Sequence, residues 1–368
     1  MTNAPSTASE VTFRAIQRHD AIALVRLAET AASASWTEAF VLWKYFQNPA
    51  GPIYGCCAEA ESQLAGFYGN SPVRIKLDDH VVTGAQALDA MVLPEARRRG
   101  VFVRMARRTY RSIDADGLRP LYGIPNPISR AGLVKRLGWT YPGEIPVWVK
   151  IVSPGAVGAR SGLEGPKAWL YRTILHTVHL TRPPQSPREE GIRVRELSAF
   201  DHRFDQLWDN VSPGFDVAVV RDGPYLTWRY VQNPLQRSLI LAAERGEELL
   251  GYVVLSFRDA DEKGVLAIAD LLLRPSEMSA GVALLHEATR RALHANCGQL
   301  QCWMLPQHSF YTRLLGQSGF VYSRSRLLPG IFRQTASFIT RLPEGATMAP
   351  DPTDLGNWFL TMGDQDYY

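Results

Sequence analysis

The sequence predicts an α/β protein built from two copies of one domain. The phrase W-(K/R)-Y-(F/V)-Q-N-P occurs in VLWKYFQNP and again in LTWRYVQNP, which places Trp43 and Trp228 185 residues apart. Two apolar runs separated by a polar turn follow each phrase, as expected for a β-hairpin. Further landmarks recur in the same order at an offset of 181 residues. Matches in register at a nearly constant offset indicate a duplicated domain.

The elements of each copy follow one order. A helix comes first and ends at the Asn-Pro pair, because the residue before a proline is disfavoured in the helical conformation. A hairpin is predicted next, with its turn at residues 60–62 in the first copy and 245–247 in the second. The following strand carries an aspartate five residues before a proline, Asp89 in one copy and Asp270 in the other.

A turn then connects this strand to a helix. Gly100 lies six residues after Pro94, Gly281 lies six after Pro275, and each glycine is expected to open the helix. The first copy places Arg97–Arg99 directly before its glycine. Helix N-termini present unpaired N–H groups and therefore bind phosphates, and arginines add charge-assisted donors. The first turn is thus a predicted phosphate site, and a solvated basic turn is the alternative.

A strand, a proline and a last helix complete each copy, which ends at Gly138-Trp139 or at Gly319-Phe320. The expected organisation is a disordered N-terminus at 1–10, a first domain at 11–150, a linker with one helix near Lys167–Leu180 at 151–191, a second domain at 192–342 and a C-terminal tail at 343–368 that docks on the domains. Trp358 and Phe359 make the tail too aromatic for simple disorder.

The composition argues against a nucleic-acid-binding protein and against a membrane-spanning protein. The formal net charge of +4 gives no indication of a nucleic-acid partner, and no run of about 18 apolar residues is present to span a membrane. The N-terminus lacks the pattern of a signal peptide, so we expect a cytoplasmic protein. Neither the four cysteines nor the spacing of His176 and His179 predicts a metal site. The oligomeric state stays open.

The order hairpin, V-x-P-x-x-R-x-x-G, helix, strand, N-x-x-S, helix, L-G-W resembles the GNAT (GCN5-related N-acetyltransferase) superfamily, and the resemblance covers both halves. It implies two tandem GNAT-like domains, each with a mixed, mostly antiparallel central sheet flanked by helices. In that family the backbone amides of an R/Q-x-x-G-x-G/A loop hold the pyrophosphate of acyl-coenzyme A. Arg97 and Gly100 match the first two fixed positions, whereas Phe102 stands where glycine or alanine is usual.

The second copy departs from the loop pattern differently. Gly281 and Ala283 match it, but Met278 replaces the Arg or Gln, and Glu277 places a negative charge near the expected phosphate. We therefore expect the first copy to bind acetyl-CoA or another acyl-CoA as co-substrate. The residues that the resemblance implies for this site are Met91, Val92, Arg97, Arg98, Arg99, Gly100, Val101, Phe102, Asn126 and Ser129.

The resemblance also suggests catalytic groups. The family usually has a tyrosine four residues before the final Gly-aromatic pair, as the acid for the departing thiolate, but these positions are Val134 and Leu315 here. A different tyrosine can substitute if the fold brings it near the sulfur; Tyr122 is the prediction, and the others are Tyr141 and Tyr311. Asp89 is the predicted base for an ammonium acceptor, with a structural role as the alternative.

Trp43 and Tyr45 fall where GNAT domains place their second helix, near the acceptor groove. Core packing is one interpretation and an aromatic wall for the substrate is the other. We also expect the tail, with Asp364, Asp366 and the terminal carboxylate, to close the acceptor pocket.

The function expected from the resemblance is an acyl-CoA-dependent N-acyltransferase, most simply an acetyltransferase, acting on a small-molecule or sugar amine by direct attack on the thioester. One alternative is an aminoacyl-tRNA-dependent transferase with paired GNAT-like domains. Another is a non-catalytic ligand-binding protein in which both loops have decayed. The acceptor, the acyl length and the choice between N- and O-acylation are open.

Overall fold

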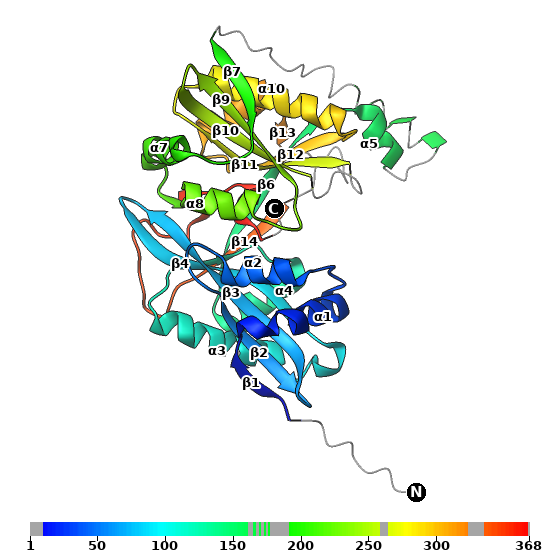
Figure 1. The fold of residues 1–368 in the computed structure, drawn as a ribbon, viewed down its shortest axis with the longest axis vertical. Coiled ribbons are helices and arrows are strands. Elements are labelled where there is room, and N and C mark those ends of the chain that lie inside the picture. The colour runs from blue at the N-terminus through cyan, green and yellow to red at the C-terminus, as the bar shows by residue number, and fades with distance from the viewer. Residues whose placement is uncertain are drawn as a thin grey trace, which may run out of the picture.

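The computed structural model describes residues 10–160, 191–257, 264–322 and 335–366, together with the six positions 165, 166, 169, 170, 173 and 176. Two α/β halves are visible in Figure 1, one blue to cyan and one green to orange, with the C-terminal segment between them. Each half is a mixed, mostly antiparallel sheet flanked by helices, which confirms the predicted fold class. The expected N-terminal disorder and the helix near Lys167–Leu180 fall largely outside the described residues.

The first half begins with a short strand and two helices and then alternates strands with helices. Its elements are β1 (Thr12–Ala15), α1 (Ala21–Ala32), α2 (Glu38–Phe46), β2 (Tyr54–Ala60), β3 (Gln63–Leu77), β4 (His80–Val92), α3 (Val101–Ala115), β5 (Leu121–Gly123), α4 (Pro127–Leu137), β6 (Thr140–Ile151) and α5 (Pro154–Arg160).

The second half repeats this order, and the tail adds a short strand and 3-10 turns. Its elements are β7 (Ile192–Leu197), α7 (His202–Val211), β8 (Val217–Val219), α8 (Gly223–Leu226) with a π turn at Thr227–Val231, β9 (Ser238–Arg245), β10 (Glu248–Ser256), β11 (Val265–Leu273), α10 (Met278–His294), β12 (Gln299–Trp303), α11 (Ser309–Gln317), β13 (Val321–Tyr322), β14 (Thr335–Arg341), β15 (Trp358–Phe359) and η6 (Met362–Asp364).

Both expected hairpins are present, as β2–β3 and β9–β10. A bulge interrupts the next strand at the same place in each copy. Tyr68 pairs with Ala90 and Asn70 pairs with Ala87, so two residues of β4, one of them Asp89, stand opposite one residue of β3. Asp270 lies at the equivalent irregularity between β10 and β11. Such bulges bend a strand and re-aim its side chains.

The two halves exchange strands. The first part of β6 pairs with β14 and its last residues, Val147–Ile151, pair with β12 of the second half. β14 in turn pairs with β5 of the first half. The sheet is therefore continuous through the molecule. The predicted ranges 11–150 and 192–342 each contain a strand that completes the other half, so neither range forms its sheet alone.

The duplicated phrase meets itself at the contact between the halves. The indole rings of Trp43 and Trp228 stack with their centroids 5.2 Å apart. The indole N–H of Trp43 donates to the carbonyl of Trp228 at 2.8 Å, and Trp228 returns the same bond to Trp43 at 3.2 Å. Reciprocal contacts of this kind are the signature of a two-fold relation. Duplication has thus preserved an internal interface.

Candidate functional site

A cavity opens in the first half where two parallel strands separate. β4 and β5 are paired only over Ala85–Ala87 and Leu121–Gly123, after which β4 continues to Val92 and the chain leaves β5 toward α4. The cavity has a volume of about 770 Å³. This size lies within the usual range for small-ligand sites. Its walls include Ala87, Leu88, Asp89, Ala90, Met91, Gly123, Ile124, Asn126 and Ser129.

The loop from β4 to α3 borders this cavity, since Met91 before it and Phe102 after it are both wall residues. Gly100 is the residue that precedes α3, with φ of +73°, and a side-chain carbon added there would meet nothing within 4 Å. The first amides of α3 have no carbonyl partner within the helix. An exposed glycine before a 15-residue helix therefore leaves open space and backbone donors for an anion.

The Arg97 side chain, which was predicted to contact phosphate, is bonded to backbone carbonyls. Its guanidinium donates to the carbonyls of Val92, at 2.9 Å, and Ala31, at 3.1 Å. These bonds tie the loop to the end of β4 and to α1. Arg98 is exposed and has a left-handed φ of +62°, so the backbone turns sharply just before the helix. The structure thus shows Arg97 bracing the loop, with Arg98 beside it on the surface.

Phe102 and the start of α4 form the adjoining wall. The Phe102 ring packs edge-on against Tyr68, with centroids 5.6 Å apart. Asn126 precedes α4, and its side-chain oxygen accepts from the amide of Ser129 at 2.9 Å. This cap explains the N-x-x-S pattern locally, because an asparagine before a helix satisfies one of its free amides.

Charged side chains gather at the other end of the cavity, on α2, on the β4 bulge and in the tail. The Lys44 ammonium lies 2.7 Å from Asp89 Oδ2 and 3.3 Å from Asp366 Oδ2. Tyr45 donates its hydroxyl to Asp89 Oδ2 at 2.6 Å. Trp36 and Phe40 place their rings 5.4 and 5.6 Å from the same ammonium. We call Lys44, Asp89 and Asp366 the charged triad.

The triad carries one net negative charge when its three members are ionised. Burial opposes the charge on Lys44, but the carboxylates of Asp89 and Asp366 outweigh it, so the pKa of Lys44 lies above its ordinary value. Burial raises the pKa of Asp366, while the Lys44 ammonium opposes that rise. The Arg229 cation also lowers the pKa of Asp366, so it adds positive charge beside the triad. The wall carboxylates of Asp89 and Asp366 can pair with a cationic ligand.

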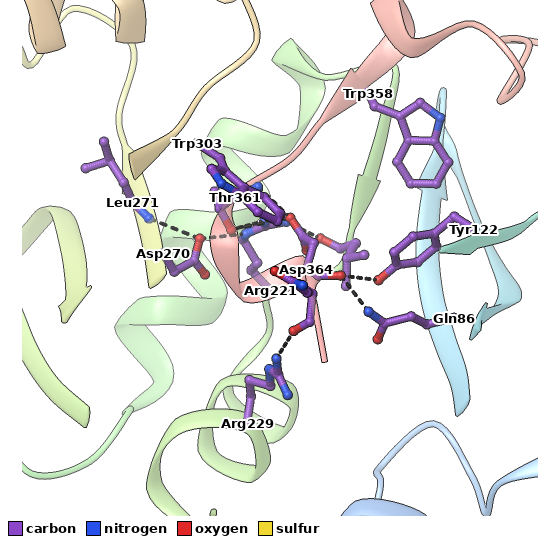
Figure 2. A network of polar contacts seen from close by, with 12 residues as sticks. Gln86, Tyr122, Arg221, Arg229, Asp270, Leu271, Trp303, Trp358, Thr361 and Asp364 are labelled. Atoms are coloured by element: carbon purple, nitrogen blue, oxygen red, sulfur yellow. Dashed lines mark hydrogen bonds and ion pairs between the residues drawn. The ribbon is translucent and has the colours of Figure 1, made fainter. Parts of the chain in front are cut away.

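The corresponding region of the second half is closed. Asp270 is 1% exposed, and Arg221 Nε donates to it at 3.1 Å. Arg221 also donates to Asp364 at 2.8 Å and to Thr361 at 3.1 Å. Figure 2 shows this buried network, in which Tyr122 donates to the carbonyl of Asp364. Asp270 is therefore a partner in an ion network, whereas Asp89 faces a cavity.

The second loop also differs in its backbone. The structure starts α10 at Met278, so Gly281 lies within the first turn of that helix and the expectation that it opens the helix is wrong. A side-chain carbon at Gly281 would lie 2.7 Å from Leu314 and 2.9 Å from Leu273. Leucines therefore occupy the space that Gly100 leaves open. Glu277 pairs with Arg245 at 3.0 Å instead of facing a ligand.

The structure brings together five of the predicted site residues and separates others. Asp89, Met91, Phe102, Asn126 and Ser129 line one cavity. The residues Val92, Arg97, Arg98, Arg99, Gly100 and Val101 lie in or beside the loop that joins two of its walls.

The three remaining predicted residues lie neither in the cavity wall nor in this loop. Trp43 packs on Trp228, and Tyr45 is fully buried behind Asp89. Tyr122 is 1% exposed and packs on Trp358 while its hydroxyl is bonded to the tail, so it is not placed to protonate a thiolate in the cavity.

Sequence reasoning missed wall residues from both halves: Trp36, Phe40, Lys44, Tyr68, Asn233, Leu235 and Gln236. A signal for Lys44 was present, because the duplicated phrase keeps a cation between its Trp and Tyr in both copies, as Lys44 and Arg229. Asn233 belongs to the second copy of the phrase, and Leu235 and Gln236 directly follow it. No pattern in the first half indicates that they complete its cavity, since only the packing of the halves brings them there.

Within the described residues, no group of three or more metal-ligating side chains is close enough to hold an ion. The helices of residues 10–160, 191–257, 264–322 and 335–366 include none with the length and apolar character needed to cross a bilayer. The terminal carboxylate, which was expected to reach the acceptor pocket, lies outside the described residues, but Asp366 two positions before it is a wall residue.

Comparison with known proteins agrees with this geometry. Residues 12–141 match the acetyltransferase (GNAT) domain, and residues 204–317 match the acetyltransferase (GNAT) family. No curated protein matches the sequence.

Solved structures with the same fold include a GCN5-related N-acetyltransferase from Anabaena variabilis ATCC 29413, with a TM-score of 0.61 and 13% identity over 90% of this chain and 72% of that one. A conserved protein of unknown function from Enterococcus faecalis V583, a probable N-acyltransferase, gives a TM-score of 0.62 and 11% identity over 91% and 73% of the two chains. A GCN5-related N-acetyltransferase from Kribbella flavida gives a TM-score of 0.56 and 12% identity over 92% of this chain and 72% of that one.

These similarities extend across both halves, in agreement with the duplication. The chain is a tandem-domain acyltransferase that belongs to the GNAT superfamily.

Proposed function

We propose that the first half transfers an acyl group from acyl-CoA, most simply acetyl-CoA, to the amine of a small molecule inside the 770 Å³ cavity. The observation that carries this proposal is the continuity of the cavity. One set of its walls, Met91, Phe102, Asn126 and Ser129, adjoins the N-terminus of α3, and another set contains the charged triad. A donor held at the first end and an acceptor at the second would meet beside the β4 bulge.

The donor end suits the phosphates of coenzyme A. The amides that follow Gly100 supply N–H donors at the positive end of a helix dipole. The open space beside Gly100 lets a pyrophosphate approach the backbone closely. The apolar walls near Met91 and Phe102 suit the pantetheine arm, which would run toward the point where β4 and β5 separate.

The acceptor end suits a cationic amine. The wall carboxylates of Asp89 and Asp366 can pair with an ammonium, and Trp36 and Phe40 offer ring faces to it. An ammonium must lose a proton before it can attack, since its pKa is about 10. We assign proton removal to Asp89, directly or through water, and the positioning of that carboxylate to Tyr45 and Lys44.

The reaction then needs no strong acid to protonate the leaving thiolate. The amine nitrogen bonds to the thioester carbon, the C–S bond breaks, and the amine proton passes to the carboxylate and then to solvent. A thiolate with a pKa of about 8.5 leaves readily at neutral pH and takes a proton from water. No role is assigned to Tyr122 in this scheme.

A thiol-release assay with acetyl-CoA and a panel of small amines tests the proposal. Asp89→Asn should lower turnover by roughly 10²- to 10⁴-fold, the usual value of general-base catalysis, with acetyl-CoA affinity kept. Asp270→Asn is the matched control, since it makes the same change at the equivalent bulge. Equal small effects on turnover at both positions would make Asp89 a structural residue. Thiol release with hydroxyl acceptors but not with amines would contradict N-acylation.

Asp366→Asn separates the tail from the base. It removes one of the two carboxylates beside Lys44 and keeps the shape of the side chain. If the tail binds the acceptor, the KM for the amine should rise with kcat less affected. If kcat falls and the KM stays constant, Asp366 and not Asp89 handles the proton. The pH dependence of kcat in both variants distinguishes these outcomes.

A further inference from the structure

A second, shallow pocket lies at the opposite end of the same helix pair. The N-terminal parts of α3 and α4 border the first cavity, through Phe102, Asn126 and Ser129. The C-terminal parts of both helices, with the end of β14, border a separate pocket of about 270 Å³. Its walls are Arg107, Tyr110, Arg111, Asp114, Arg136, Leu137 and Arg341. We call it the arginine pocket.

One guanidinium of this pocket is held in place. Arg341 donates to both oxygens of Asp114, at 3.0 and 2.9 Å, and lies 4.5 Å from the centre of the Tyr110 ring. Trp139 in turn donates to the hydroxyl of Tyr110 at 2.8 Å. The base of the pocket is therefore preorganised, and its single carboxylate, Asp114, is already paired.

The other three guanidiniums have no carboxylate partner among the described residues. Arg107, Arg111 and Arg136 are exposed, and none of them lies within 4.0 Å of a described Asp or Glu oxygen. Cations near a helix C-terminus stabilise its dipole, which accounts for Arg136 in the last turn of α4. The same reason does not apply to Arg107, which lies in the middle of α3.

The surrounding sequence strengthens the charge. Residues 97–136 contain ten arginines and one lysine against two aspartates, whereas the whole chain has a formal net charge of only +4. The rest of the chain is thus net acidic, and the excess positive charge is concentrated on the segment that holds α3 and α4. Such a local field attracts anions although the whole protein is nearly neutral.

We propose that the arginine pocket binds the phosphate group of a small phosphorylated molecule. Guanidinium groups present paired N–H donors that match phosphate oxygens, and several arginines around one small pocket supply the charge that a dianion requires. Arg107, Arg111 and Arg136 contact the phosphate, and Tyr110 and Leu137 face the organic part. The site is separate from the acyl-transfer cavity and does not depend on the proposed reaction.

Calorimetric titration with inorganic phosphate at constant ionic strength, without any acyl-CoA, tests this site. We expect saturable binding that becomes roughly tenfold weaker or more in Arg107→Gln/Arg111→Gln, because each charge-assisted bond contributes on that scale. Arg108→Gln is the matched control, since Arg108 is exposed on the same helix and is not a wall of the pocket. Its affinity should stay within about twofold of the wild type.

The outcomes separate clearly. The site is supported if phosphate affinity is lost in Arg107→Gln/Arg111→Gln and retained in Arg108→Gln. Equal affinity in both variants would place phosphate elsewhere, for example at the loop before α3, and would overturn the proposal. Equally strong binding of citrate would contradict a phosphate-selective pocket, and a short RNA duplex that binds while phosphate does not would identify a nucleic-acid surface instead. The substituted side chains Arg107, Arg108 and Arg111 are all exposed, so we expect both variants to fold and the affinities to be comparable.

Discussion

Replacement of Arg221 by methionine should remove the ion pair that holds the C-terminal tail against the second half. Arg221 is 1% exposed and is the cation that joins Asp270 to Asp364, which are equally buried. Its removal leaves two carboxylates in the interior without their shared partner. Breaking a buried ion pair from one side typically costs about 3–5 kcal/mol, because the remaining charge is desolvated and uncompensated. We expect a loss of that size in the free energy of unfolding, measured by denaturant titration at pH 7.

The direction of the pH effect gives a second test of the same variant. Burial already raises the pKa of Asp364 against the opposing charge of Arg221, so removal of Arg221 should raise the pKa of Asp364 further. The folded state then binds more protons than the unfolded state, so the deficit should shrink as the pH falls from 7 toward 5.

A charge-free version of the network is the control for Arg221→Met. Adding Asp270→Asn and Asp364→Asn removes the stranded carboxylates and should recover part of the lost stability. A single Arg221→Met protein that unfolds within about 1 kcal/mol of the wild type would refute the reasoning, because the network would then be exposed or already neutral.

Three further changes have definite expected results. Gly363→Ala should destabilise the fold by roughly 1–3 kcal/mol, because the added carbon would overlap Tyr230 Oη and approach the carbonyl of Ala269. The same change should lower turnover more than acyl-CoA affinity. Gly316→Ala is the control in both assays, since a carbon added there meets nothing within 4 Å. Burial lowers the pKa of Lys150 from 10.5 to about 8, so wild-type stability should rise between pH 8 and 10.5, and that slope should vanish in Lys150→Met. Deletion after Asn357 should unfold the protein, since it removes Trp358, Phe359 and Leu360 from the core; a melting temperature near that of the wild type would show that the tail only covers a surface.

The order of elements could be predicted from the sequence because local patterns determine it. The hairpin turns, the Asn-Pro helix stop and the Asp-Pro-Gly spacing all act over a few residues, and duplication provided an internal check on each. Strand exchange could not be predicted this way. Nothing local to β6 or β14 distinguishes pairing within one copy from pairing with the other, and only the assembled sheet decides it.

The candidate site was predictable in its donor half and not in its acceptor half. Met91, Phe102, Asn126 and Ser129 belong to patterns tied to one helix start or one strand end, and all of them line the cavity. The acceptor half joins α2, the segment from Asn233 to Gln236 and the tail, which are distant along the chain. Tyr122 shows the opposite failure, since a strand position that suggests an open pocket is covered by Trp358.

We propose above all that one site per chain, in the first half, holds acyl-CoA at the start of α3. Calorimetric titration with acetyl-CoA of the wild type, Gly100→Val and Gly117→Val tests it most directly. Both glycines have φ of +73° and open space around them, so the two variants carry matched backbone strain, and only Gly100 precedes α3. We predict one site per chain in the wild type, an affinity at least about tenfold weaker in Gly100→Val, and no change in Gly117→Val. The absence of acetyl-CoA binding, two equivalent sites, or equal losses in the two variants would contradict the claim.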